Sequence, residues 1–123
     1  MELAKSGKLN NVDLLLGDIT DTSLSFLNGD STASNFGKML DTASPQDIAL
    51  AIINMVYQVI GVMSVFAARA RDSSRVIVTG RGSNNLLGQK TLAVISDMYG
   101  IEFIYPEFAE YTTAIGAGLS NTN

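Results

Sequence analysis

The chain has 123 residues, a common length for a single domain, and 46% of them are hydrophobic while 16% are charged. This composition supplies enough apolar surface for a core, which excludes a wholly disordered chain. The net charge of -4 argues against a nucleic-acid-binding protein, and the absence of cysteine and histidine excludes disulfides, thiolate or imidazole metal sites and Ser-His-Asp catalysis.

The first eleven residues are polar and of mixed charge, without the apolar region of a secretory signal. We therefore expect one domain with a single core, located in the cytoplasm, with no nucleic acid among its partners.

The front third of the chain carries short signals. Residues 12–19 (VDLLLGDI) fit either a strand or a short helix, and residues 28–31 (NGDS) are a turn sequence within a polar connecting loop. Asp13 and Asp18 raise the question of a magnesium site. A spacing of five matches no defined metal-binding loop, so we expect both at turns or strand ends.

An uncharged run over residues 48–68 predicts a long helix from Pro45 to Arg71. Ser44 can cap this helix, and Asp47 places negative charge where the helix dipole is positive. A helix of about 26 residues is about 40 Å long, which exceeds the width of a small domain. Part of its surface is therefore expected to meet a partner chain.

The same run is long enough to span a membrane as a helix. Asn54, Gln58 and Gly61 recur at helical spacing and place a stripe along one face that lipid would disfavour. We therefore predict a buried core helix and no membrane, and we expect this stripe to be the surface that meets a partner.

A strand-helix-strand unit follows. Residues 75–80 (RVIVTG) predict a strand buried on both faces, residues 84–98 a helix that Gly100 ends, and residues 101–105 a second strand parallel to the first. A final helix over residues 109–119 is rich in Ala and Gly and suits close packing against the sheet. The predicted fold class is α/β.

The glycine-rich turn at residues 80–85 (GRGSNN) leaves the end of the first predicted parallel strand. Sheets of this class bind ligands at that edge, where glycines let the backbone approach a ligand and a helix begins. A turn that merely connects strand to helix explains the same residues, because the sequence is neither a P-loop nor a dinucleotide fingerprint.

Other candidate sites are weaker. Glu107 and Glu110 share a predicted helical face, but solvated charges at a helix start are commoner than a catalytic pair. Five aromatic residues are predicted mostly to fill the core rather than to stack on a base: Tyr99, Phe103, Tyr105, Phe108 and Tyr111. We assign no catalytic and no metal-binding residue.

Five blocks, in order, resemble type II pantothenate kinases of the actin-like ATPase superfamily, and the resemblance extends over nearly the whole chain. The block T-A-S-N-F-G is the most specific, since no secondary-structure requirement explains it. The blocks are Asn11–Ile19, Thr32–Gly37, the long helix ending at Ala67-Ala68-Arg69, Val76–Gly80 and Thr113–Ala117.

This resemblance implies a partial ribonuclease H-like (actin-like ATPase) domain, with residues 1–123 as the C-terminal part of the nucleotide-binding domain. It implies ATP-dependent phosphorylation of pantothenate, the first step of coenzyme A biosynthesis, with ATP and magnesium used by the parent enzyme. It also implies a homodimer formed through the Pro45–Arg71 helix.

By the same resemblance, one loop contacts the adenosine side of the nucleotide and another lies near the nucleotide cleft. The first loop is Gly80, Arg81, Gly82 and Ser83, with Ser83 or Arg81 as the polar contact, and the second is Asn35, Phe36 and Gly37. Gly116 and Ala117 would let the last helix pack close to the sheet.

The family's Asp-Gly-Gly-Thr segment, catalytic carboxylate and second phosphate loop are expected to precede Met1, so we expect no turnover from this chain alone. The alternative function is a non-catalytic, self-associating scaffold fragment. Binding of ADP at residues 80–85 separates the two hypotheses.

Overall fold

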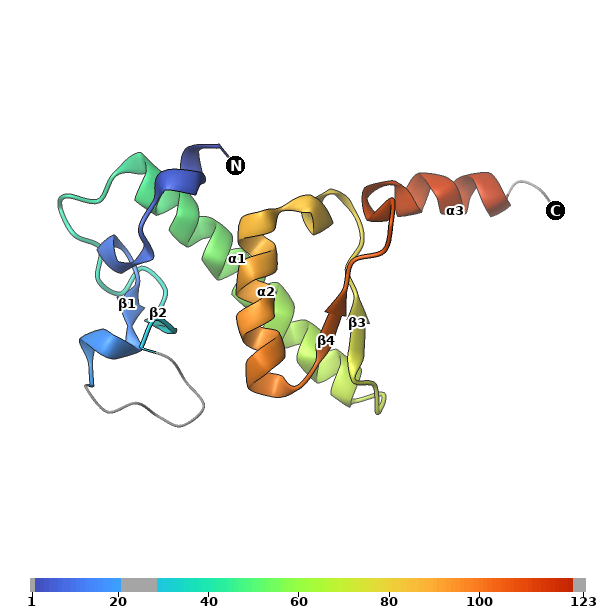
Figure 1. Ribbon diagram of the computed structural model, residues 1–123, viewed down its shortest axis with the longest axis horizontal. Helices are drawn as coiled ribbons and strands as arrows, with labels where there is room; N and C mark the ends of the chain where they lie inside the picture. The colour runs from blue at the N-terminus through green and yellow to red at the C-terminus, as the bar shows by residue number, and fades with distance from the viewer. Residues whose placement is uncertain (1, 21–28, 121–123) are drawn as a thin grey trace. The chain divides into compact units, whose positions relative to one another are not determined.

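A computed structural model describes residues 2–20 and 29–120 of the chain (Figure 1). The chain divides into two compact units, residues 1–56 and residues 57–123, whereas the sequence predicted a single core. Each unit has its own buried side chains. Helix α1 (Pro45–Arg69) contributes residues 45–56 to the first unit and residues 57–69 to the second.

The start of α1 is confirmed, because Ser44 and Asp47 cap it reciprocally. The Asp47 amide donates to the Ser44 hydroxyl (3.2 Å), and the Ser44 amide donates to the Asp47 carboxylate (2.9 Å). The helix ends at Arg69, two residues before the predicted end. Asp72 adopts a left-handed conformation (φ 52°), and the Ser73 amide bonds back to the Ala68 carbonyl, which closes the helix.

Helix α1 buries one face and exposes the other. The buried residues recur every three or four positions: Ala51, Asn54, Tyr57, Gly61, Val65 and Ala68. The exposed face is also apolar and comprises Ile52, Val56, Val59, Ile60, Met63 and Phe66, named here the α1 apolar stripe. By length and composition α1 qualifies as a possible membrane span, a test that core helices of soluble proteins also pass.

In the first unit, strand β1 (Leu14–Leu15) pairs antiparallel with β2 (Thr32–Ser34). The sequence predicted either a strand or a short helix at residues 12–19. Both are present, because a 3-10 turn at Leu16–Asp18 follows β1 directly. Further 3-10 turns lie at Leu3–Ser6 and Leu9–Asn11. Gly29 and Asp30 form the predicted turn, while Asn28 lies outside the described residues.

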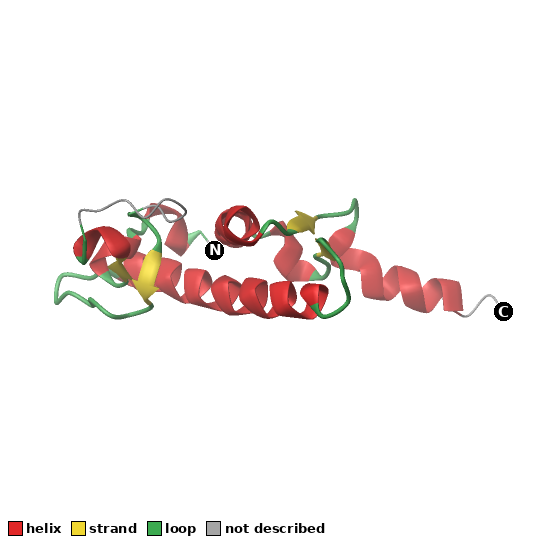
Figure 2. Ribbon diagram, turned by 90° about the horizontal axis from the view of Figure 1, so that it is seen from below, coloured by secondary structure: helices red, strands yellow, loops and turns green. Residues whose placement is uncertain are grey.

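The second unit contains the predicted strand-helix-strand element. Strand β3 (Arg75–Ile77) pairs parallel with β4 (Glu102–Ile104), and helix α2 (Leu86–Tyr99) connects them and contacts β4 (Figure 1). The α/β class and the parallel pairing are confirmed. The strands are short and helices predominate (Figure 2).

The prediction that the first of these strands is buried on both faces is wrong. Its side chains alternate between exposed and half-buried, and Ile77 is 65% exposed. Among the described residues the sheet has only these two strands, and no side chain of β3 is fully buried.

Helices α1 and α2 approach closely at Gly61. A Cβ atom at this position would lie 2.5 Å from Ile95 Cδ1 and 2.8 Å from Leu92 Cδ2. Leu92, Ile95 and Val65 are buried and form the core here. Gly100 ends α2 as predicted, in the left-handed conformation (φ 65°) that glycine adopts without strain.

This packing corrects the predicted partner surface. Asn54 is buried within the first unit and Gly61 within the second, while Gln58 is only partly exposed. The Asn54-Gln58-Gly61 stripe therefore lies on the internal face of α1 and is not available to a second chain.

The end of the chain also differs from expectation. A 3-10 turn (Ala109–Tyr111) leads into helix α3 (Thr112–Ser120), whose side chains are all exposed. No atom would lie within 4 Å of a Cβ at Gly116, so α3 does not pack on the sheet as predicted. Phe108 and Tyr111 are exposed rather than in the core, and Glu107 lies in a turn, so it shares no helical face with Glu110.

Candidate functional site

The loop at residues 80–85 follows the β3 segment and leads directly into α2, as predicted. Gly80 has a φ of 83°, a conformation that favours glycine, and its amide bonds to the Ala109 carbonyl (2.8 Å). A 3-10 turn covers Arg81–Asn84. The loop thus lies beyond the carboxyl end of a parallel strand, where sheets of this class bind ligands.

Three side chains each hold one carbonyl oxygen of this loop. The Ser83 hydroxyl donates to the Gly80 carbonyl (2.7 Å), the Tyr57 hydroxyl to the Gly82 carbonyl (2.6 Å), and the Gln89 amide to the Ser83 carbonyl (2.6 Å). The loop conformation is therefore fixed by partners from α1, from α2 and from the loop itself.

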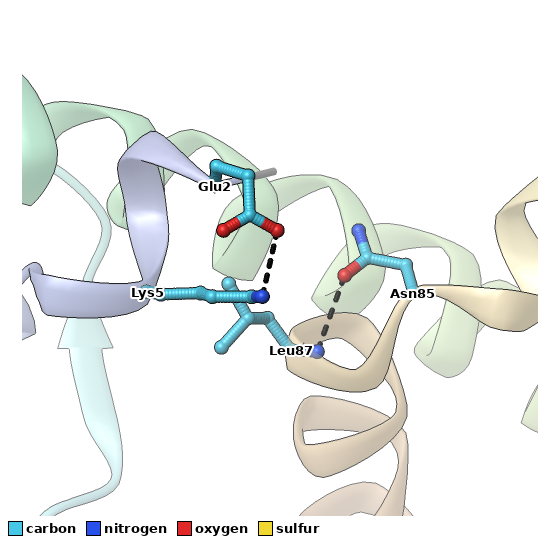
Figure 3. A network of polar contacts seen from close by, with 4 residues as sticks. All are labelled: Glu2, Lys5, Asn85 and Leu87. Atoms are coloured by element: carbon cyan, nitrogen blue, oxygen red, sulfur yellow. Dashed lines mark hydrogen bonds and ion pairs between the residues drawn. The ribbon is translucent and has the colours of Figure 1, made fainter.

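Asn85 caps the start of α2. Its side-chain oxygen accepts hydrogen bonds from the amides of Leu87 (3.1 Å, Figure 3) and Gly88 (3.3 Å). These are amides of the kind that bind a phosphate at a helix start. Because Asn85 occupies them, this helix start is not a free phosphate site.

The predicted contact residues of the loop differ in access. Ser83 is buried and its hydroxyl is used within the loop, whereas Arg81 and Gly82 are exposed. A Cβ at Gly80 would meet no atom within 4 Å, so the backbone there faces open space. Of the two side chains expected to contact a ligand, Arg81 is the one that reaches solvent.

Asn35, Phe36 and Gly37 form a tight turn in the first unit. The Gly37 amide donates to the Ser34 carbonyl (3.1 Å), and Phe36 adopts a φ of 57°, which is uncommon for a residue with a bulky side chain. The Phe36 amide donates to the carboxylate of Asp13 (2.9 Å). Such a conformation persists only where the surroundings enforce it.

Asp13 is fully buried and organises this turn. Besides the Phe36 amide, it accepts hydrogen bonds from Asn54 Nδ2 (3.0 Å) and the Thr32 hydroxyl (3.4 Å). Sequence reasoning missed this cluster. The available signal was Asn54, a polar residue at the same helical spacing as Ala51 and Gly61, which marks a polar partner inside the protein.

Asp18 shares no site with Asp13. Its carboxylate accepts hydrogen bonds from Lys38 and from the Leu15 amide (2.9 Å), and these bonds hold the pKa of Asp18 below its ordinary value. Over the described parts of the chain, no three Asp or Glu side chains come together in an arrangement that could hold a metal ion.

The first unit has two further polar contacts near its start. Lys5 forms an exposed ion pair with Glu2 (2.7 Å, Figure 3), which adds little to stability. Asp47 has a larger role, because it also accepts hydrogen bonds from the Lys8 amide (2.7 Å) and the Asn11 side chain (3.1 Å). It thereby ties the N-terminal segment to the first turn of α1.

Comparison with known proteins gives a consistent result. The family model described as Fumble matches residues 1–120. Proteins named type II pantothenate kinase from Staphylococcus aureus strains USA300, COL and MRSA252 are each 28% identical over 121 residues. The match covers 94% of this chain and 45% of each relative, so the chain spans less than half of their length. The resemblance predicted from the five sequence blocks is confirmed.

Proposed function

Since this chain belongs to the Fumble family, we propose that its loop at residues 80–85 binds the adenosine side of ATP in an enzyme that phosphorylates pantothenate. The observation that carries the proposal is the loop itself. It lies at the carboxyl end of a parallel strand, its carbonyl oxygens are held by Tyr57, Ser83 and Gln89, and its backbone is open at Gly80.

The residues fit the adenosine side of a nucleotide better than its phosphates. A planar base and a ribose can lie against an open glycine backbone, and the exposed Arg81 guanidinium can stack on a base or attract negative charge. The amides of Leu87 and Gly88 already serve Asn85, so they do not cradle a phosphate. This chain would therefore bind and orient the nucleotide.

ATP supplies the phosphoryl group in this reaction, and magnesium neutralises its charge. The described residues contain no cluster that would hold the magnesium, so no catalytic step is assigned to them. We expect the 123-residue chain to bind nucleotide without turning over pantothenate, as part of an actin-like ATPase domain of a cytoplasmic enzyme.

For the first unit, taken by itself, we propose that the turn at Asn35–Gly37 is a nucleotide-facing segment of the parent enzyme. Its support is the left-handed Phe36, which Asp13 holds through the Phe36 amide. Backbone strain of this kind is concentrated at functional sites.

We also propose a homodimer formed through α1. The surface assigned to it is the α1 apolar stripe, whose side chains are 42 to 67% exposed. Soluble monomers rarely expose a large apolar patch, so an apolar helix face of this kind favours a protein–protein interface. The buried Asn54 and Gly61 have no part in this contact.

Titration of the ¹⁵N-labelled chain with ADP tests the nucleotide proposal. Amide shifts should change at residues 80–85 and saturate. Adenosine should change the same amides, and inorganic triphosphate should leave them unchanged. Shifts scattered over the chain, or shifts with triphosphate alone, would contradict an adenosine site.

The second candidate, a non-catalytic self-associating fragment, is favoured by the exposed apolar side chains of α1 and α3. It predicts self-association with no response to ADP anywhere in the chain. The same titration, followed by sedimentation of the sample, therefore separates the two functions.

A further inference from the structure

Tyr57 connects α1 to the candidate loop. Its side chain is 9% exposed, and its hydroxyl donates a hydrogen bond to the Gly82 carbonyl at 2.6 Å. No sequence pattern singles out Tyr57, because it lies in an uncharged helix 25 positions before its partner.

The aromatic ring of Tyr57 is packed closely, in addition to the hydrogen bond of its hydroxyl. It lies against Gly88 in the first turn of α2, where a Cβ atom would come within 2.3 Å of two ring atoms. No residue other than glycine leaves room for the ring at this place. Tyr57 therefore contacts the loop through its hydroxyl and the start of the next helix through its ring.

The peptide that Tyr57 holds is restrained from both sides. This peptide joins Gly82 to Ser83. The Gly82 carbonyl also accepts a hydrogen bond from the Asn85 amide (3.0 Å), and the Ser83 amide donates a hydrogen bond to the Gly80 carbonyl (3.0 Å). These last two bonds are internal to the loop. Tyr57 is the partner that attaches this peptide to the helical framework.

We propose that Tyr57 is a positioning residue for nucleotide binding: its hydroxyl holds the Gly82-Ser83 peptide so that the loop keeps the conformation that accepts the adenosine side of a nucleotide. This inference rests on the proposed function. It adds that α1 supports the nucleotide loop through one hydroxyl group, in addition to its place in the core. A loop held in its binding conformation binds more tightly, because a smaller share of the molecules must rearrange first.

The test compares the unmodified chain with Tyr57→Phe, which removes one oxygen atom and keeps the ring against Gly88. Tyr105→Phe is the matched control. Tyr105 is a half-buried tyrosine of the same unit, and burial, with a smaller contribution from Tyr57, raises the pKa of its hydroxyl. In the described structure the Tyr105 hydroxyl bonds to no carbonyl of the loop.

Two quantities are measured on each chain: the hydrogen exchange rates of the Ser83, Asn85 and Leu92 amides, and the dissociation constant of ADP from amide shifts. For Tyr57→Phe we expect exchange at Ser83 and Asn85 to be about three- to tenfold faster, and the ADP dissociation constant to rise by a similar factor. Exchange at Leu92, in the buried face of α2, should not change. Tyr105→Phe should match the unmodified chain.

Equal exchange rates in the two variants would overturn the inference. Faster exchange at Leu92 by the same factor would also overturn it, since Tyr57 would then support the whole unit. An unchanged ADP dissociation constant with a loosened loop would show that the held conformation is not the one that binds. If the unmodified chain shows no response to ADP, the proposed function fails, and the nucleotide role of Tyr57 fails with it. Failure of the proposed function is thus distinguished from failure of the Tyr57 inference, because it is detected in the ADP titration of the unmodified chain alone.

Discussion

Asn54 donates a hydrogen bond at 3.0 Å to the buried carboxylate of Asp13, which lies 41 positions earlier in the chain. The same carboxylate accepts the amide of Phe36. One buried group thus joins α1 to the turn that carries the most specific sequence block. A buried charge is tolerated only when such partners are present.

The first prediction concerns this bond. Asn54→Ala should lower the free energy of unfolding by about 2 kcal/mol, the cost of removing a hydrogen bond to a charged group. Urea denaturation measures the change. Thr42→Ala, an exposed position in the same unit and outside the α1 apolar stripe, is the control and should leave stability nearly unchanged. Equal losses in the two variants would mean that the Asp13 cluster contributes nothing specific.

The second prediction is a pH dependence set by Asp47. Hydrogen bonds from the Ser44 amide, the Asn11 side chain and the Lys8 amide hold the pKa of Asp47 well below its ordinary value. A carboxylate with a lowered folded-state pKa stabilises the protein above its unfolded pKa of about 3.9, and this contribution is lost as the pH falls below that value.

Thermal midpoints measured at pH 7, 5 and 3 test this sign. The unmodified chain should lose more stability between pH 5 and pH 3 than Asp47→Asn, which cannot titrate. Asp18 is a second carboxylate with a lowered pKa, so Asp18→Asn should also lose less stability between pH 5 and pH 3 than the unmodified chain. Parallel curves for the unmodified chain and Asp47→Asn would contradict the prediction.

The third prediction contrasts two glycines. Gly88→Ala brings a Cβ atom into the Tyr57 ring, so we expect a loss of about 1 to 3 kcal/mol in unfolding free energy. Gly116→Ala adds its methyl group to open space within α3 and should not destabilise the chain, with a gain of up to about 1 kcal/mol from helix propensity. The denaturant midpoint should therefore fall for Gly88→Ala and stay level or rise for Gly116→Ala.

The fourth prediction tests the proposed homodimer. Phe66→Glu places a charge in the α1 apolar stripe and should convert dimer to monomer at micromolar concentration, as seen by sedimentation velocity. Leu119→Glu makes the same kind of change at another exposed apolar position, in α3, and should leave the dimer intact. A chain that sediments as a folded monomer before any substitution would refute the dimer itself.

The sequence predicted local structure well. Ser44 and Asp47 identified the start of α1 because capping depends on residues three apart, and Gly100 identified the end of α2 because few other residues adopt its conformation. The parallel β3–β4 pair followed from two apolar runs on either side of a helix. All these signals act over short distances along the chain.

The predictions of which face of an element is buried failed where both faces are apolar. Periodicity cannot tell which apolar face of α1 is packed, so the Asn54-Gly61 side was assigned outward although it is buried. The pairs Asp13–Asn54 and Tyr57–Gly82 join residues far apart in sequence, and no local pattern predicts them. The position of the glycine loop was confirmed, whereas its supporting side chains required the structure.

Helix α3 has nine residues and no buried side chain. A helix this short is marginal in water when nothing packs against it. Whatever covers Ile115 and Leu119 would therefore both order this segment and remove apolar surface from solvent. Calorimetry would record such an association as a decrease in heat capacity.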